Sequence, residues 1–433
     1  MSIAVPLAIL AISVVLLLGA IALVRHLGQR FGWTAEVQRK SVHISIGLYA
    51  LLLPLLFQQR WPVVLLILLA LALMLLLRTP ASRTAGLGAA IHSVERKSWG
   101  DVLLAVAIGF VFLRANGNYI LYALPIAVIA ISDAAAALAG SSYGRRRFHV
   151  EEGMKSYEGV AVFFFVTWIV AMVMLLLLTD IPRPNVVVLA MTIAVFGALV
   201  EAVSWRGLDN LFVPVTIHFF LAGYLNAPPV TLALLGIGFT VAVLAVALLT
   251  PRLGLSVHAS RALVIAIFFF LGVGGAHGSV LPVLAIAAHL VARVRMPAED
   301  AHPDLDFIAT LCAVGLIWYF VGETTGPNAI NLYNMSLAGM LLALVMLAVR
   351  MDWRLLVPVY IAVLALYLWL VDLSPGYSRW AHGLTWLAGG SLGAVAAMCL
   401  GWPGWYQHHR AFRIAGISSF VPALAYFTQA VIA

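Results

Sequence analysis

Charged side chains interrupt the apolar first half of the chain in five short polar motifs. The motifs occupy residues 38–47, 95–109, 131–148, 151–159 and 201–214. A charged group inside or beside a membrane-length apolar run is costly to bury and usually serves function. We therefore expect the chemistry of the protein to lie in these motifs.

Four carboxylates in the motifs are candidate ligands or acid–base groups: Asp101, Asp133, Glu201 and Asp209. Asp133 precedes Gly140 by seven residues, about 10 Å at helical rise, so it needs a cation, a metal or strong hydrogen bonds. Asp209 and Asn210 place two oxygen ligands side by side, which suits a hard cation such as Mg²⁺. Plain charges at helix N-termini are the alternative for Asp101 and Asp209.

Cations accompany these acids at Arg39, Lys40, Arg96 and Lys155. Phosphoryl chemistry needs both signs of charge, because carboxylates hold Mg²⁺ while Lys and Arg neutralise charge in the transition state. The chain has no Walker A sequence and no protein-kinase HRD or DFG set. Basic residues that only anchor helix ends are the alternative for Arg39, Lys40 and Arg96.

Small residues follow Asp133, and Gly140 and Gly144 enclose two serines. This spacing predicts a flexible polar turn with room for a nucleotide or phosphate, although small residues also permit close helix packing. His43 lies one turn inside an apolar run, as either a functional or a packing histidine.

The composition excludes a soluble enzyme, a disordered scaffold and a secreted disulfide domain. Only 10% of the 433 residues are charged and 64% are hydrophobic, and the mean hydropathy is +1.05. Cys312 and Cys399 lie in apolar runs without CxxC partners, so we expect packed core residues and no zinc site. No basic tail or basic–aromatic patch is present, so nucleic-acid binding is not expected.

Apolar runs predict an all-α, polytopic membrane protein with about sixteen transmembrane helices. The runs lie near residues 3–24, 42–57, 62–77, 101–113, 119–140, 159–178, 186–204, 211–225, 229–250, 261–276, 279–292, 306–321, 332–349, 354–371, 381–400 and 414–431. The first reads as a retained span rather than a cleaved signal.

Basic residues predict the orientation. Of 25 Lys and Arg residues, all but Arg60, Arg114, Arg183 and Arg379 fall in loops on one side. The positive-inside rule makes that side cytoplasmic, so all five polar motifs face the cytoplasm and both termini lie outside. We expect a multi-pass protein of a bacterial-type inner membrane, with no indication of an oligomer.

The motifs, in this order, resemble those of the polyprenol kinase family, which includes dolichol kinase, phytol kinase and the CTP-dependent diacylglycerol kinase. The resemblance covers roughly residues 37–226. It rests on Arg39, Lys40, His43 and Gly47; the segment from Arg96 to Asp101; Asp133, Ala136, Gly140 and Gly144; Lys155, Ser156, Glu158 and Gly159; and Asp209, Asn210 and Pro214. Asp101 stands where the family has Glu, which shortens the side chain by one methylene group.

The resemblance implies a CTP-dependent kinase that phosphorylates the hydroxyl of a membrane isoprenoid or lipid alcohol of the polyprenol, dolichol, phytol or diacylglycerol type. Catalytic roles are implied for Asp133, Lys155 and Asp209, with Asp133 and Asp209 binding Mg²⁺ or another divalent cation. Contacts to the nucleotide are implied for Arg39, Lys40, Arg96, Gly140, Gly144, Ser156, Glu158 and Gly159. The resemblance implies that four further residues lie beside the acceptor alcohol or hold the side chains that bind the metal and the nucleotide. These are His43, Asp101, Glu201 and Asn210.

The polar motifs end before the stretch at residues 250–256, which divides the chain into two predicted domains. Residues 1–250 form the membrane-embedded kinase domain, and residues 251–433 form an additional transmembrane region of unknown role.

Three other functions stay open. A CTP:lipid-phosphate cytidylyltransferase would use the same charges, a secondary transporter agrees with the number of spans, and a pseudoenzyme or assembly subunit agrees with the departure at Asp101.

Overall fold

The computed structural model describes residues 3–77, 99–150, 153–205, 207–325, 329–373 and 384–432. Its contacts divide the chain into two compact units, Met1–Val241 and Ala242–Ala433. The division of function at residue 250 stays a prediction, because contacts define folding units and not activities.

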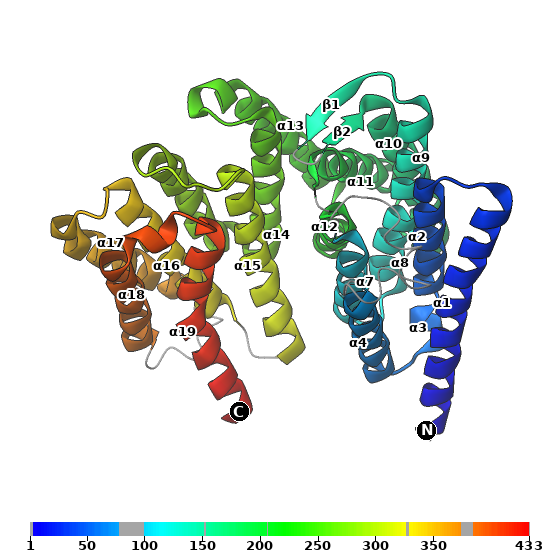
Figure 1. Cartoon of the computed structure of the whole chain (residues 1–433), viewed down its shortest axis with the longest axis horizontal. Coiled ribbons are helices and arrows are strands. Elements are labelled where there is room, and N and C mark those ends of the chain that lie inside the picture. Colours follow the sequence, from blue (N-terminus) through cyan, green and yellow to red (C-terminus); the bar gives the residue numbers. More distant parts are fainter. Residues whose placement is uncertain are drawn as a thin grey trace. The chain divides into compact units, whose positions relative to one another are not determined.

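The first unit consists of helices and one β-hairpin (Figure 1). Its elements are α1 (Ala4–Phe31), α2 (Ala35–Leu51), α3 (Leu53–Leu56), α4 (Arg60–Leu77), α7 (Gly100–Ala115), α8 (Tyr119–Ala127), the π-helical turn η1 (Val128–Ser132), α9 (Asp133–Tyr143), β1 (Arg147–Val150), β2 (Gly153–Ser156), α10 (Tyr157–Leu178), α11 (Arg183–Val203), α12 (Asp209–Tyr224) and the first part of α13 (Pro229–Leu253). In Figure 1 the hairpin lies at the end of this unit opposite the N-terminus.

The second unit is helical throughout the residues described. It contains α14 (Val257–Arg295), α15 (Pro303–Thr325), α16 (Ile330–Ala348), α17 (Trp353–Asp372), α18 (Leu384–Gly401), the 3₁₀ turn η3 (Pro403–Tyr406) and α19 (Arg410–Ile432). Its centre is α16, which is 89% buried in its apolar window and packs against α14, α17, α18 and α19.

Eleven helices among the described residues are long and apolar enough to cross a membrane. A polytopic, essentially all-α protein is therefore supported, with the antiparallel pair β1–β2 as the exception. The expected sixteen spans stay a prediction. Several expected runs form helices of only 16 or 17 residues, among them α2, α7 and α12.

The helix α14 has 39 residues, yet its two ends lie together. Arg293 donates a hydrogen bond to the backbone oxygen of Leu253, which precedes the helix. A straight helix would separate residues 257 and 293 by about 54 Å. The segment must therefore reverse direction between its apolar parts, Val257–Leu271 and His277–Arg295. This agrees with two expected runs, and it brings Arg252 and Arg293 to the same side.

The polar turn expected at residues 140–144 is not present, and this expectation is wrong. Helix α9 continues to Tyr143, and Gly144 is only the residue that ends it. In the charged segment before α10, residues 153–156 form β2. Ser156 then caps α10, since its hydroxyl oxygen accepts a hydrogen bond of 3.0 Å from the Gly159 N–H.

A continuous helical segment made of α8, η1 and α9 forms the core of the first unit. Of its membrane-length window, Tyr119–Tyr143, 78% is buried. It packs against α2, α7, α10 and α12. Tyr122 donates to the Ala50 carbonyl at 2.7 Å, and a ring nitrogen of His218 lies 2.9 Å from the Leu121 carbonyl, so α2 and α12 are tied to it by hydrogen bonds. Functional residues on α2 and α9 are thereby held in register.

Gly47 sets how closely α2 approaches η1. A Cβ atom at this position would lie 2.3 Å from the Cβ atom of Ala130. We expect Gly47→Ala to lower the free energy of unfolding by about 1–3 kcal/mol, because the helices must separate to admit the methyl group. Thermal unfolding of the purified protein in detergent measures this.

Gly19→Ala is the matched control for Gly47→Ala. Gly19 also lies in a helix of the first unit, but an added Cβ atom there meets no atom within 4 Å. Both substitutions gain the same intrinsic helix propensity, so only packing distinguishes them. Equal melting temperatures for the two variants would contradict the close approach of α2 and η1.

Candidate active site

A cavity of about 630 Å³ lies among α2, α7, α9, the β-hairpin, α10, α11 and the start of α12. It gathers most of the site residues expected from the sequence. Those that line it are Arg39, Lys40, His43, Asp101, Asp133, Gly140, Lys155, Ser156, Gly159, Glu201, Asp209 and Asn210. Gly144 and Glu158 are not part of its lining, and Arg96 lies outside the described residues.

Asp133 forms a buried ion pair with Lys40. The Lys40 Nζ lies 2.6 Å from Asp133 Oδ2, and the residues are only 4% and 2% exposed. His43 lies on the same helix, one turn further along. Its Nε2 is 3.0 Å from the Ile129 carbonyl and 3.3 Å from Asp133 Oδ2. Lys40 is therefore not an exposed anchor at the membrane surface, but the partner that compensates a buried carboxylate.

The π-helical turn η1 ends directly before Asp133. Such turns are rare and occur frequently at functional sites, because one extra residue per turn redirects the side chains that follow. Here the turn holds the Ile129 carbonyl that His43 contacts. The backbone irregularity and the ion pair thus occur at the same place.

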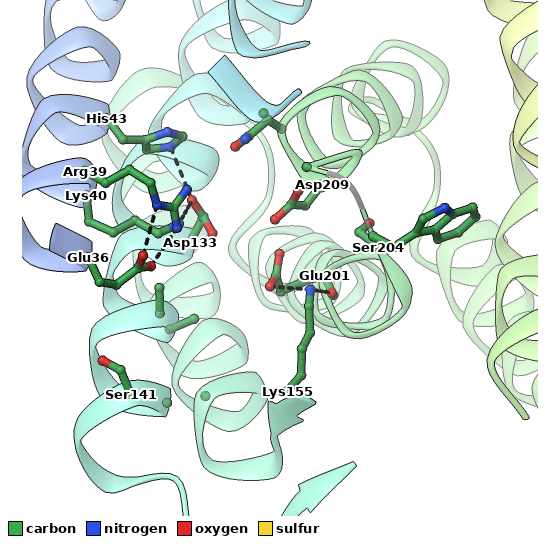
Figure 2. A pocket seen from close by; sticks show the side chains of 18 of the residues that line it. Glu36, Arg39, Lys40, His43, Asp133, Ser141, Lys155, Glu201, Ser204 and Asp209 are labelled. Carbon is green, nitrogen blue, oxygen red and sulfur yellow. Dashed lines mark hydrogen bonds and ion pairs between the residues drawn. The ribbon is translucent and has the colours of Figure 1, made fainter. Parts of the chain in front are cut away.

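Arg39 has a different environment from Lys40. It forms two hydrogen bonds with the carboxylate of Glu36, at 2.6 and 3.0 Å, and stays partly exposed. Its guanidinium lies at the mouth of the cavity, beside Lys40 and Asp133 (Figure 2). Arg39 is therefore accessible to a ligand in a way that Lys40 is not.

Lys155 reaches Glu201 from the hairpin. Its Nζ lies 2.8 Å from Glu201 Oε1 and also donates to the Glu201 backbone oxygen. Burial lowers the pKa of Lys155, but the carboxylates of Glu201 and Asp209 raise it by more, so the net pKa is above its usual value. The ammonium group therefore stays charged at neutral pH.

Three carboxylates face one another at the centre of the cavity. Oxygen atoms of Asp133, Glu201 and Asp209 lie within 4.8 Å of one another, and Figure 2 shows them on three different helices. Glu201 Oε2 and Asn210 Oδ1 are buried and have no hydrogen-bond partner among the residues that the structure describes. Unpartnered buried oxygens beside clustered carboxylates are the donors that a hard divalent cation prefers, so the residues fit such an ion.

The glycines near the cavity lie where α9 meets the start of α10. A Cβ atom on Gly140 would come within 2.9 Å of Ser156 Oγ, and one on Gly159 within 3.0 Å of the Ala136 carbonyl. A Cβ atom on Gly144 would lie 2.3 Å from the Gly140 carbonyl. These contacts support the helix-packing alternative, while contacts of Gly140 and Gly144 with a nucleotide stay a prediction.

Glu158 turns away from the cavity and supports the hairpin. Both of its carboxylate oxygens accept the backbone N–H of Arg146, at 3.1 and 3.3 Å. Its proposed contact with the nucleotide has no geometric support in the residues described. Glu158 instead holds the segment that leads into β1.

The beginnings of three helices face the same cavity. They contribute Gly100 and Asp101 from α7, Ser156 and Gly159 around the start of α10, and Asp209 and Asn210 from α12. Helix N-termini carry partial positive charge and unpaired N–H groups, which favour phosphate. Asp101 and Asp209 lie in the first turns of α7 and α12. This agrees with the alternative interpretation of both residues as plain charges at helix N-termini.

Sequence reasoning missed several residues that line the cavity, among them Glu36, Arg147, Ser204 and Trp205. Arg147 belongs to a run of three arginines, so its basic character was visible, but its place in the lining of the cavity was not. Trp205 is 8% exposed and follows Glu201 closely in the chain. Nothing in the local pattern distinguishes it from an interfacial tryptophan.

The Lys40–Asp133 pair makes a stability prediction. Lys40→Met leaves a buried carboxylate without its main counterion, so we expect a loss of about 3 kcal/mol or more in the free energy of unfolding. The double variant Lys40→Met/Asp133→Asn should recover most of this loss, since neither charge of the pair then remains. Chemical unfolding in detergent measures both variants.

Arg39→Met is the matched control, one residue away on the same helix. Its ion pair with Glu36 is partly exposed, and such pairs contribute about 1 kcal/mol or less. If Lys40→Met were no more destabilising than Arg39→Met, the buried ion pair would not hold α2 to α9.

Comparison with known proteins identifies a relative that covers part of the chain. The phytol kinase of Synechocystis sp. is 32% identical to this chain over 201 residues, which are 46% of this chain and 84% of that protein. No sequence profile of a known protein family matches the chain, and no solved structure matches it.

The relationship covers most of the length of the relative, whereas more than half of this chain lies outside it. The ordered motifs and the cavity that collects them agree with this relationship. The chain belongs to the polyprenol kinase family.

Proposed function

We propose that the chain is a CTP-dependent kinase that phosphorylates the hydroxyl group of a membrane isoprenoid or lipid alcohol. The relationship to a phytol kinase supports a lipid kinase at the level of the family. The main structural support is the cavity, where three carboxylates meet Lys40, Lys155 and Arg39 at one end of the first unit. Phosphoryl transfer depends on such a combination of positioned charges.

A divalent cation such as Mg²⁺ is part of the proposal. Asp133 and Asp209 would hold it, and the unpartnered oxygens of Glu201 and Asn210 add two further donors. When bound, the ion would neutralise phosphate oxygens and increase the electrophilicity of the γ-phosphorus. The remaining steps rest on the side chains of the chain itself.

The cations bind and orient the triphosphate in this proposal. Arg39 lies at the mouth of the cavity and Lys155 approaches from the hairpin, so they reach the phosphates from two sides. The N-termini of α7, α10 and α12 add partial positive charge. Lys40 neutralises Asp133 and does not bind the triphosphate directly in this proposal, because its ammonium group is buried in that ion pair.

The alternative role for one of the two carboxylates Asp133 and Asp209 is to accept the alcohol proton in place of holding the cation, and Asp209 is the better candidate for it. Asp133 and Glu201 each have a lysine within 2.8 Å, whereas no ion pair is recorded for Asp209 within the described residues. A carboxylate oxygen that is not engaged in an ion pair is open to accept a hydrogen bond from the alcohol hydroxyl. The alcohol oxygen would then bond to the γ-phosphorus while the bond to the β-phosphate oxygen breaks, releasing CDP and leaving the proton on Asp209.

The proposal predicts which phosphate of CTP reaches the lipid. Membranes with the purified protein, a panel of prenols, phytol and diacylglycerol, and γ-labelled CTP should yield a labelled lipid. Asp133→Asn should lower this rate by about 10²-fold or more, because the charge arrangement at the reaction centre is lost. Asp180→Asn is the control, since Asp180 is an exposed acid beyond the far end of α10.

Labelling at the α-phosphate tests the cytidylyltransferase alternative. That enzyme would transfer CMP to a lipid phosphate and release pyrophosphate, so the α label and not the γ label would enter the lipid. Unchanged activity of Asp133→Asn would contradict the proposed site. A secondary transporter has less support, because its binding groups are expected near the bilayer midplane.

We propose that the cavity faces the cytoplasm, where CTP is present. The distribution of Lys and Arg supports this, and the hairpin lies at the opposite end of the first unit from the N-terminus (Figure 1). A reporter that is active only outside the cytoplasm should therefore be active when fused to the C-terminus. A fusion in the loop after α9 should be inactive, and the reverse pattern would invert the topology.

The second unit would form a separate transmembrane region in this scheme. Its described charged residues gather near helix ends, as in the cluster of His289, Arg293 and Asp304. Asp304 accepts from His289 at 2.9 Å and from Arg293 at 2.5 Å, so this cluster joins the start of α15 to the end of α14. These contacts hold the end of α14 against the start of α15, which is a structural role.

A further inference from the structure

The cavity in the first unit is not polar on all sides. Ile46 on α2, Met74 on α4 and Leu104 on α7 also line it. A nucleotide triphosphate gains little from these side chains. Their presence indicates a second kind of ligand surface within the same cavity.

Along α2 the lining changes from charged to apolar. Arg39, Val42 and Ile46 all line the cavity at helical spacing, and each is partly exposed. Seven residues of helix cover about 10 Å, so a guanidinium and an isoleucine lie at different depths of one face. On α7 the same change occurs from Asp101 to Leu104, which are one turn apart.

The apolar part of the cavity does not continue along the axis of the helices. One and two turns beyond Leu104, the side chains of Ile108 and Val111 are 3% and 0% exposed. The core of the first unit is therefore closed below the cavity. An extended apolar ligand must leave sideways.

The apolar lining of the cavity comes from α2 on one side and from the pair α4–α7 on the other. Helix α2 packs against α1, α8, η1 and α9, and α4 packs against α7 and α1. Within the described residues, no comparable packing joins α2 to α4 or α7, although all three helices line the cavity. This is the side on which Ile46, Met74 and Leu104 lie.

We propose that the hydrocarbon tail of the acceptor alcohol leaves the cavity between α2 and the α4–α7 pair, in contact with Ile46, Met74 and Leu104. The proposal rests on the proposed kinase function. A lipid alcohol has its hydroxyl at the polar end and its chain in the bilayer, which matches the change of lining with depth. These three residues then determine which acceptors are accepted, because they contact the chain beyond its first isoprene unit.

A pair of tryptophan variants tests the route. Ile46→Trp should raise the KM for a C20 prenol by about tenfold or more, the size of effect that small changes in an apolar pocket have on a substrate. The KM for a C5 prenol and the KM for CTP should not change. Leu48→Trp is the matched control, on the same helix but 48% exposed and outside the cavity lining.

Photolabelling provides a readout that needs no turnover. A C20 prenol with a diazirine on its second isoprene unit, added to the full chain in lipid nanodiscs, should label peptides that contain Ile46, Met74 or Leu104. Excess unlabelled prenol should reduce this labelling, and Ile46→Trp should reduce it more than Leu48→Trp.

The outcomes separate the two proposals. Three outcomes would overturn the route. They are labelling of other peptides, an equal rise of the KM for the C5 and C20 prenols, and a rise of the KM for CTP alone in Ile46→Trp. Absence of any labelled lipid from γ-labelled CTP in the wild-type protein would refute the kinase function, while the photolabel still decides where a long-chain alcohol lies.

Discussion

The organisation of the first unit depends on compensating negative charge inside a lipid-embedded fold. Three carboxylates lie within 4.8 Å of one another, and such a cluster is unfavourable unless cations are close. Lys40 compensates Asp133 and Lys155 compensates Glu201, each from a different element. The positions of α2 and of the hairpin follow from this requirement, because each delivers one lysine.

The surrounding packing makes these contacts possible. Gly47 lets α2 approach η1, and the π-helical turn precedes Asp133 directly. Gly140 and Gly159 let α9 and α10 approach closely, so that Ser156 and Lys155 reach the cavity from β2. The small residues thus serve the site indirectly, since they bring its charged groups to the required distance. In this reading, a change at a glycine would affect the site through helix separation.

Much of the candidate site was predictable because burying a charged group among apolar residues costs free energy. An acidic residue in a strongly apolar run has to be compensated, so Asp133, Glu201 and Asp209 stand out from residue type and context alone. The partners of these acids were not predictable, because Lys40 and Asp133 are 93 residues apart in the chain. The turn expected after Gly140 was wrong for a related reason. Packing of α9 on α10 makes a helix favourable where the local sequence is rich in Gly and Ser.

What the sequence determined by itself was the class of protein and the family, and it also predicts an orientation in the membrane. Apolar length, the distribution of basic residues and the order of short motifs are properties of the chain, so they can be read without coordinates. Only the tertiary structure decided which lysine pairs with which acid, that Glu201 joins the other two carboxylates, and that Gly144 and Glu158 lie outside the cavity lining. The reason is physical, because these features depend on distances between residues of different helices, and helix packing sets those distances.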